Sequence, residues 1–399
     1  MTESLTIGLL SPAWPGTHTP NGIVTSVNNL AEGLQALGHT PVIIATQDDT
    51  PPEGTAFVPI ADNTWRLIDK VKAKLIGGTE VNNQLRIKEM VTAIRTAHDR
   101  HGLDAVIMEE SKGWPYDIAP AIPVPLIANL HGPWKLLSQV LGRPLEQEDH
   151  DRIALEAKAF GRVAGLMAPS QASMAMTDGI APETPRALIR NSYPPGPAPD
   201  PGERVAGHIL FVGRVERLKG ADTVLMAFEA LAASHADARL TFVGPDNGLL
   251  MEDGRTLPME EAMKALAPHH HDRITYLGRQ TPAQIAALRR THPVALIASR
   301  FENLNYSMLE AISAAQAIVS TAVGGPAEIL DEDVTARLVP AGDAAAMAGA
   351  LAALLDDPAL QSRLSTAALA MLERDFHPNV VAAQTVAFVK QVLARPTHL

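Results

Sequence analysis

Short apolar runs alternate with longer segments of helical pattern along almost the whole chain. In the first half the apolar runs cover residues 5–10, 41–45, 104–108, 125–130 and 164–169. Continuous apolar runs of this length are typical of strands that a sheet buries on both faces. Residues 22–39 differ, because their apolar side chains recur every three or four positions and the segment reaches Gly38, a usual residue at the end of a helix.

The same alternation starts again after a proline-rich break. Residues 192–206 contain five prolines, which exclude a helix or a central strand there. Beyond the break, further apolar runs cover residues 208–213, 239–244, 273–278, 293–298 and 317–321. Repeated strand–helix units predict parallel sheets covered by helices on both faces. We expect an α/β fold of two Rossmann-like domains that face each other across a cleft, the first over 1–195 and the second over 196–377.

Composition narrows the possible functions. The 399 residues carry a formal net charge of −11, which argues against binding to nucleic acid, because that needs a basic surface. The chain has no cysteine, which excludes disulfides, thiolate metal sites and thiol nucleophiles. Its first residues lack the pattern of a signal peptide, and no apolar run approaches the ~18 residues of a membrane span. We expect a cytoplasmic protein that could still contact the inner face of the membrane.

Ligands of open parallel sheets bind beyond the carboxyl ends of the strands, so the residues after each apolar run are candidates for function. After 208–213, Arg214 and Lys219 lie in a loop that enters a helix near Gly220. Two cations beside a helix N-terminus suit a diphosphate. The alternative is a pair of solvated surface charges, which is the common state of loop cations.

Two glutamates follow the run at 293–298, Glu302 in a loop and Glu310 in a predicted helix. A carboxylate accepts hydrogen bonds from two adjacent hydroxyls, so these residues suit a ribose diol or the vicinal hydroxyls of a sugar. Two plainer interpretations remain open. Ser307 and Glu310 fit a capping box, and Glu302 fits a solvated loop acid.

The first half offers weaker candidates. Gly22 begins a helix, where backbone N–H groups could approach a phosphate. His131 follows an apolar run and precedes Gly-Pro, although a lone histidine is more often a partly buried residue bonded to backbone. Glu109 and Glu110 follow another run, where they could hold an acceptor hydroxyl, although paired acids are usually solvated. The adjacent histidines of "PHHHD" at 268–272 lack the spacing of metal ligands, and we predict no metal site.

The order of the motifs adds a resemblance. The segments "NGIVTSVNNLAEGLQALGH", "NLHGPW", "FVGRVERLKGADTVLMAF", "SRFENLNYSMLEAIS" and "TAVGGPAEIL" occur in the order and spacing of the retaining glycosyltransferases of family 4. This resemblance covers about residues 5–395. It implies the GT-B fold, a second domain that holds a nucleotide sugar, and a C-terminal helix within 378–399 that crosses back to the first domain.

The resemblance also implies a reaction and roles for residues. A sugar would pass from a UDP- or GDP-sugar to an unknown hydroxyl acceptor with retention, without a metal or another cofactor. Arg214 and Lys219 would stabilise the leaving diphosphate, while Glu302 and His131 would lie near the transferred sugar. The remaining matched positions would bind the donor, namely Gly22, Glu310, Asn303, Leu304, Asn305, Leu277, Gly278 and Arg279.

The chain departs from the family pattern in one turn, and other functions stay open. Residues 314–317 replace the usual glycine and proline, so we expect a turn that is built differently. A catalytically silent GT-B subunit that binds a partner is the main alternative. A GT-B phosphorylase would need a pyridoxal-phosphate lysine, which nothing marks. Residues 63–78 mix basic and apolar side chains and could lie on an anionic membrane, although an ordinary surface helix is the plainer interpretation.

Overall fold

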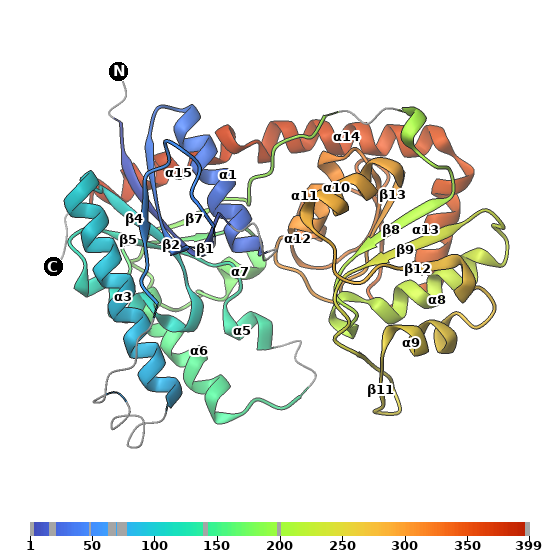
Figure 1. Cartoon of the computed structure of the whole chain (residues 1–399), viewed down its shortest axis with the longest axis horizontal. Coiled ribbons are helices and arrows are strands. Elements are labelled where there is room, and N and C mark those ends of the chain that lie inside the picture. Colours follow the sequence, from blue (N-terminus) through green and yellow to red (C-terminus); the bar gives the residue numbers. More distant parts are fainter. Residues whose placement is uncertain are drawn as a thin grey trace. The chain divides into compact units, whose positions relative to one another are not determined.

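The chain forms two compact α/β units (Figure 1). This computed structural model describes residues 4–15, 21–47, 49–62, 69, 78–138, 143–197 and 201–395. Unit 1 contains the chain up to Ser192 and the C-terminal segment from Pro378, and unit 2 contains Tyr193–His377. The first change of unit therefore lies at the start of the proline-rich segment.

Unit 1 is built on a parallel sheet in the order β3-β2-β1-β4-β5-β6-β7. Its strands are β1 (Thr6–Trp14), β2 (Thr40–Gln47), β3 (Phe57–Pro59), β4 (Ala105–Glu109), β5 (Leu126–Asn129), β6 (Gly165–Ala168) and β7 (Arg186–Leu188). Strands β2 and β3 lie on one side of β1, and β4 to β7 lie on the other. Loops that leave β1 and β4 therefore diverge, and this switch point is where open parallel sheets bind ligands.

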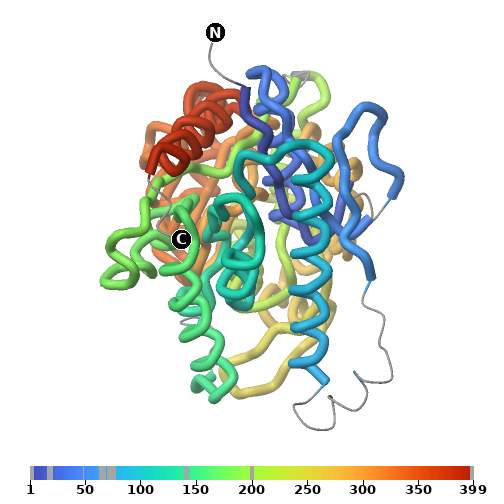
Figure 2. The backbone as a smooth tube through the Cα atoms, turned by 90° about the vertical axis from the view of Figure 1, so that its left-hand side faces the viewer, coloured from blue at the N-terminus to red at the C-terminus, as the bar shows by residue number. Residues whose placement is uncertain are grey.

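Helices cover both faces of this sheet. They are α1 (Gly22–Ala36), α3 (Gly78–His101), α4 (Pro115–Ile118), α5 (Trp134–Leu137), α6 (Gln147–Phe160), α7 (Gln171–Ala175) and α15 (Pro378–Leu393). Successive side chains of β1 enter different cores, because neighbouring residues of a strand point to opposite faces. Leu9 packs in the core with α1 and α15, and Leu10 packs in the core with α3. Figure 2 shows α15 in red and α3 in light blue.

The C-terminal helix α15 packs against α1, as Figure 1 shows. A side chain at Gly33 of α1 could not be accommodated, because a Cβ there would lie 2.3 Å from the carbonyl oxygen of Pro378. Glycine thus allows the two helix backbones to approach closely. Phe388 and Val392 of α15 make a similar contact with Gly165 of β6.

Unit 2 has a parallel sheet in the order β12-β9-β8-β13-β14-β15 and a separate two-stranded hairpin. Its strands are β8 (His208–Val212), β9 (Arg239–Val243), β12 (Ile274–Tyr276), β13 (Val294–Ile297), β14 (Ala317–Thr321) and β15 (Arg337–Val339), with the hairpin of β10 (Leu249–Leu250) and β11 (Thr256–Leu257). The switch point lies between β8 and β13. The predicted parallel sheets are confirmed in both units.

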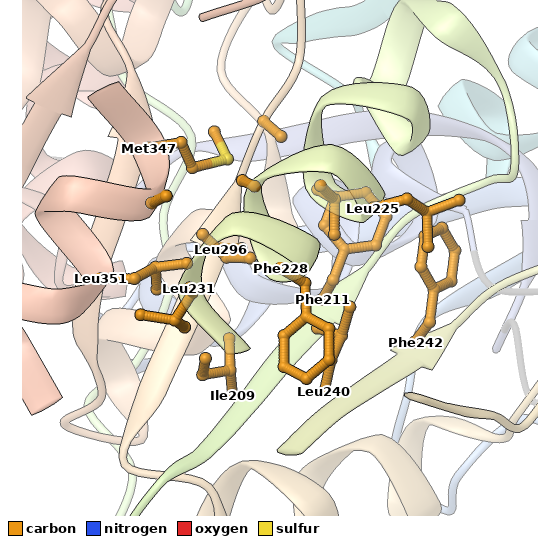
Figure 3. Close-up of a cluster of buried hydrophobic side chains, with 14 of the residues drawn as sticks. Ile209, Phe211, Leu225, Phe228, Leu231, Leu240, Phe242, Leu296, Met347 and Leu351 are labelled. Carbon is orange, nitrogen blue, oxygen red and sulfur yellow. The ribbon is translucent and has the colours of Figure 1, made fainter. Parts of the chain in front are cut away.

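The helices of unit 2 are α8 (Ala221–Ala232), α9 (Met259–Leu266), α10 (Pro282–Thr291), α11 (Tyr306–Ser313), α12 (Gly324–Ile329), α13 (Ala344–Asp356) and α14 (Pro358–Phe376). Figure 3 shows the core between one face of the sheet and helices α8 and α13, with Phe211, Phe228 and Phe242 among its members. The other face packs against α11 and α14. These two cores hold the strand ends in place, so the loops that follow β8 and β13 start from fixed positions.

The turn after α11 corrects one prediction. Residues 314–317 were expected to form a turn of different construction, but Ala315 adopts the left-handed conformation itself, with φ of 50°. The Arg204 guanidinium donates to the carbonyl oxygens of Ala314 and Ala315 at 2.9 and 2.6 Å. These bonds help to hold an alanine where a glycine would be unstrained.

Candidate active site

The candidate site of unit 2 is built from the loops that follow β8 and β13. Gly220, at the start of α8, is in the left-handed conformation, and a Cβ there would lie 2.0 Å from the carbonyl oxygen of Ala298. The two loops therefore touch backbone to backbone. The Arg300 amide donates to the carbonyl oxygen of Leu218 at 2.9 Å, which adds a direct bond between them.

Arg300 also clamps the two loops through its side chain. Its guanidinium makes two 2.7 Å contacts with the two carboxylate oxygens of Asp222, in the first turn of α8. It also donates to the carbonyl oxygen of Arg217 at 2.6 Å. A bidentate arginine–carboxylate pair fixes orientation as well as distance. The turn that carries Lys219 is thereby held against the loop that carries Glu302.

Lys219 and Glu302 meet in an ion pair. Glu302 is only 6% exposed, so it is not the solvated loop acid of the plainer interpretation. Its Oε1 accepts from both the Lys219 ammonium and the Ser299 hydroxyl, the latter at 2.6 Å. Ser299 is itself fixed, because the Thr321 hydroxyl donates to its carbonyl oxygen at 2.6 Å. Among the described residues, Oε2 of Glu302 is the oxygen without such contacts.

Two glycines of α12 support this loop from the other side. A Cβ at Gly324 would lie 1.8 Å from the carbonyl oxygen of Glu302, and one at Gly325 would lie 1.8 Å from that of Asn303. The Gly325 amide donates to the carbonyl oxygen of Glu302 at 3.3 Å. Only a residue without a side chain allows this approach, which explains the Gly-Gly pair of the sequence "VGGPAEIL".

Glu310 lies in α11 and pairs with a buried arginine that the sequence did not single out. Arg289, 3% exposed, donates to Oε2 of Glu310 at 2.9 Å, to the Ser307 hydroxyl at 3.1 Å and to the Gln316 side chain at 3.1 Å. The capping-box interpretation of Glu310 is wrong, because Asn305 is the N-cap of α11 and accepts from the Met308 amide. The Glu310 side chain remains 31% exposed.

The other predicted residues of unit 2 lie on the same edge of the sheet. The Arg214 guanidinium pairs with Glu216 at 2.9 Å and is about half exposed. Leu277 and Arg279 are exposed, and Gly278 between them has a left-handed backbone. Leu304 is buried beneath the loop, which leaves backbone groups rather than this side chain for a ligand.

In unit 1, Gly22 is the first residue of α1, after the N-cap Asn21, whose side chain accepts from the Ile23 amide at 2.8 Å. His131 follows β5. Its Nε2 lies 3.1 Å from the side-chain amide of Asn129, so the two groups share a hydrogen bond. Burial lowers the pKa of His131 to about 4, so the ring is neutral at pH 7.

The two acids at the end of β4, Glu109 in the strand and Glu110 after it, have different surroundings. Glu110 is 2% exposed, and its oxygens accept from the His131 and Gly132 amides at 2.9 and 2.7 Å. Glu110 therefore anchors the loop that carries His131, and burial raises its pKa to about 8. Glu109 lines a cavity of unit 1, and burial raises its pKa to about 7.

Two further predictions concern other partners. Within the described ranges, no group of three or more histidine, aspartate or glutamate side chains could hold a metal ion. His269 and His270 of the "PHHHD" loop instead both contact Glu229. No helix in the described part of the chain is long and apolar enough to cross a membrane. Of the proposed membrane segment 63–78, all but Asp69 and Gly78 lie outside the described residues.

The fold and the two switch points define a GT-B protein. The structure resembles sucrose-phosphate synthase from Thermosynechococcus elongatus with a TM-score of 0.73, at 19% identity, over 98% of this chain and 99% of that one. It also resembles Anabaena HepE in complex with UDP-glucose, with a TM-score of 0.69, at 15% identity, over 97% and 100% of the two chains. The predicted α/β, GT-B fold is confirmed.

Sequence comparison then gives the family. Residues 20–195 match the model of Glycosyltransferase Family 4, and residues 206–357 match that of Glycosyl transferases group 1. Together the two models span most of the chain, which belongs to the glycosyltransferases of family 4.

Individual relatives share about a quarter to a third of their aligned residues with this chain. A phosphatidyl-myo-inositol mannosyltransferase of Mycolicibacterium smegmatis is 25% identical over 97% of this chain and 94% of its own length. A glycogen synthase of Mycobacterium tuberculosis (strain ATCC 25618 / H37Rv) is 24% identical over 91% and 89%. A D-inositol 3-phosphate glycosyltransferase of Pseudarthrobacter chlorophenolicus is 33% identical, over 42% of this chain and 38% of its own.

Proposed function

We propose that this protein is a retaining glycosyltransferase that moves a sugar from a nucleotide-diphosphate sugar to a hydroxyl acceptor without a metal ion. The ion pair of Lys219 and Glu302 at the switch point of the second sheet carries this proposal. It puts a phosphate-binding cation beside a carboxylate that can accept from sugar hydroxyls.

The donor is bound in parts by different loops. Arg214 and Lys219 hold the diphosphate, and the Lys219 ammonium has three N–H donors, of which the Glu302 contact uses one. Oε2 of Glu302 accepts from the sugar, together with backbone groups of residues 303–305. The exposed oxygen of Glu310 accepts from the ribose, and residues 277–279 flank the base.

Cationic side chains supply the stabilisation that the leaving group requires. As the bond between the sugar C1 and the diphosphate oxygen breaks, negative charge grows on that oxygen, where Arg214 and Lys219 stabilise it. The acceptor oxygen attacks C1 from the face that the diphosphate leaves, and its proton passes to a diphosphate oxygen. The configuration at C1 is therefore retained, and no side-chain nucleophile is needed.

Unit 1 contributes polar groups to the same reaction. The neutral His131 can donate from its one ring N–H to a hydroxyl of the transferred sugar, since its pKa of about 4 keeps the ring uncharged. Glu110 acts through His131 as a positioning residue, because it holds the backbone of that loop. We also assign the N-terminus of α1 at Gly22 to the diphosphate, because a helix N-terminus favours negative charge.

The base of the donor is uridine or guanosine in this proposal. The structure of HepE with UDP-glucose supports a UDP-sugar, and the mannosyltransferase among the relatives supports a different sugar. Calorimetric titration of the whole chain with UDP, GDP, ADP and their sugars, with EDTA present, would separate these choices. We expect one diphosphate to bind and the other bases to bind at least ~10-fold more weakly.

Variants connect binding with chemistry. We expect Lys219→Met and Glu302→Gln to abolish slow hydrolysis of the donor, while Glu373→Gln, an exposed acid on α14, leaves it unchanged. Proton NMR of the released sugar at early times should show the α configuration of the donor. Release of the β anomer would contradict retention, and binding without any turnover would favour the silent-subunit alternative.

A further inference from the structure

Unit 1 contains a cavity of about 190 Å³ at the carboxyl end of β1 and β4. This position is the switch point of the first sheet, just as the Lys219–Glu302 pair lies at that of the second. A cavity of about 150 Å³ can hold benzene, so this volume suits a single ring rather than a chain. Leu10, Ile60, Met90 and Met108 form its apolar wall.

Two buried polar atoms in the cavity wall lack partners. Oε2 of Glu109 and Nε1 of Trp114 have no hydrogen-bond partner among the described residues. An unsatisfied buried polar atom costs about 1–3 kcal/mol, so such atoms mark places where a ligand or water is bound. Glu109 can accept from a hydroxyl, and the Trp114 indole can donate to an oxygen.

Cations outnumber acids around the cavity. Arg86, Lys112 and Arg152 line it with Glu109 as the acid. Arg152 is committed elsewhere, because it pairs with Glu156 at 2.9 Å. No carboxylate in the described ranges lies within ion-pair distance of Arg86 or Lys112, although Asp62 and Glu109 act on Arg86 through their charges. A net positive wall attracts an anionic ligand.

The turn that carries Lys112 is held in an unusual conformation. Lys112 has φ of 55°, a region that non-glycine residues rarely adopt. Close packing maintains it, since a Cβ at the following Gly113 would lie 2.5 Å from the Leu155 side chain of α6. Strained residues of this kind concentrate at ligand sites.

We propose that this cavity binds the acceptor, and that the acceptor is a polyol with an anionic group such as a phosphate ester. Arg86 and Lys112 bind the anionic group, and Glu109 accepts from a hydroxyl. This inference rests on the proposed function, because an acceptor implies a transferase. The same chemistry occurs in a soluble sugar phosphate and in the head group of a phospholipid.

The test is binding of inositol 1-phosphate and glucose 6-phosphate to the whole protein, measured by calorimetry against inositol and glucose. We expect each phosphate to bind at least ~10-fold more tightly than its neutral counterpart. Lys112→Gln should reduce affinity for the phosphates about tenfold, while Lys158→Gln, an exposed lysine on α6, should not. Vesicles of phosphatidylinositol and phosphatidylcholine, in a flotation assay, separate a lipid head group from a free phosphate.

The outcomes distinguish this proposal from the proposed function. Equal affinity for phosphates and neutral polyols, or no effect of Lys112→Gln, overturns the anionic acceptor even when a nucleotide binds to unit 2. Phosphate binding at the cavity without nucleotide binding supports the site as an anionic polyol site and removes the transferase. Glucosylation or mannosylation of a phosphate-bearing polyol, lost in Glu109→Gln and in Lys112→Gln, supports both.

Discussion

Replacing Glu310 by alanine tests the ion pair beneath the proposed ribose site. Arg289 is buried, and its guanidinium contacts the Glu310 carboxylate at 2.9 Å. Removing one partner of a buried ion pair costs about 3–5 kcal/mol, because the other charge stays buried. Here the cost is smaller, since Ser307 and Gln316 still accept from Arg289 and the Glu310 side chain is 31% exposed.

We expect a loss of about 2 kcal/mol in the unfolding free energy of unit 2 for Glu310→Ala. For a unit of this size, 1 kcal/mol shifts the melting temperature by about 2–4 °C, so the melting temperature should fall by about 4–8 °C. The assay is thermal melting of the full chain followed by circular dichroism. Glu373→Ala, which removes an exposed acid of the same unit, is the matched control.

A second variant makes the cause specific. Arg289→Met combined with Glu310→Ala removes both charges, so no unpaired charge stays buried. The double variant should therefore recover part of the loss. A melting temperature for Glu310→Ala within about 1 °C of the parent would refute the buried pair. Because Glu310→Ala is expected to lower the melting temperature by itself, ligand binding to this variant must be judged against its own ligand-free melting temperature.

Three further predictions concern packing and pH. Gly33→Ala should destabilise unit 1 by about 1–3 kcal/mol, because the new Cβ would lie 2.3 Å from a backbone oxygen of α15. Urea unfolding measures this change, and an unchanged urea midpoint would contradict the contact. Ala315→Gly should stabilise unit 2 by about 1 kcal/mol, since φ of 50° strains alanine, and a lower melting temperature would argue against that conformation. The raised pKa of Glu109 should make the free energy of unfolding fall as pH rises from about 4.5 to about 7, because the folded form retains a proton that the unfolded form has released. Glu109→Gln should flatten this part of the pH profile. A profile of Glu109→Gln identical to that of the parent would count against the raised pKa.

Strand positions were predictable because buried strands of parallel sheets leave an unmistakable apolar pattern. All ten predicted runs overlap strands, from β1 to β14. The missed strands of the two parallel sheets, β3, β7 and β15, are three residues long and lie at sheet edges, and the two-residue hairpin strands β10 and β11 were missed as well. An edge strand is paired on one side only and needs no continuous apolar run, so its sequence can be like that of a loop, although the edge strand β12 did carry an apolar run.

The sequence did not predict which residues pair with the functional side chains. Arg289 and Arg290 are adjacent in the last turn of α10, and nothing in the pattern separates the buried arginine from its half-exposed neighbour. The clamp of Arg300 on Asp222 joins residues far apart in the chain. Glu109 and Glu110 formed one acidic pair in the sequence, whereas the structure turns Glu109 to a cavity and Glu110 to the backbone of His131.

The sequence by itself determined which residues reach the ligand edge of each sheet. Parallel strands end at a common edge, so any residue after an apolar run is placed there whatever its partners are. Tertiary structure alone decided which charges meet, how deeply each is buried and where a cavity remains. Those properties depend on side chains brought together from separate loops and helices, so the local sequence around each residue does not predict them.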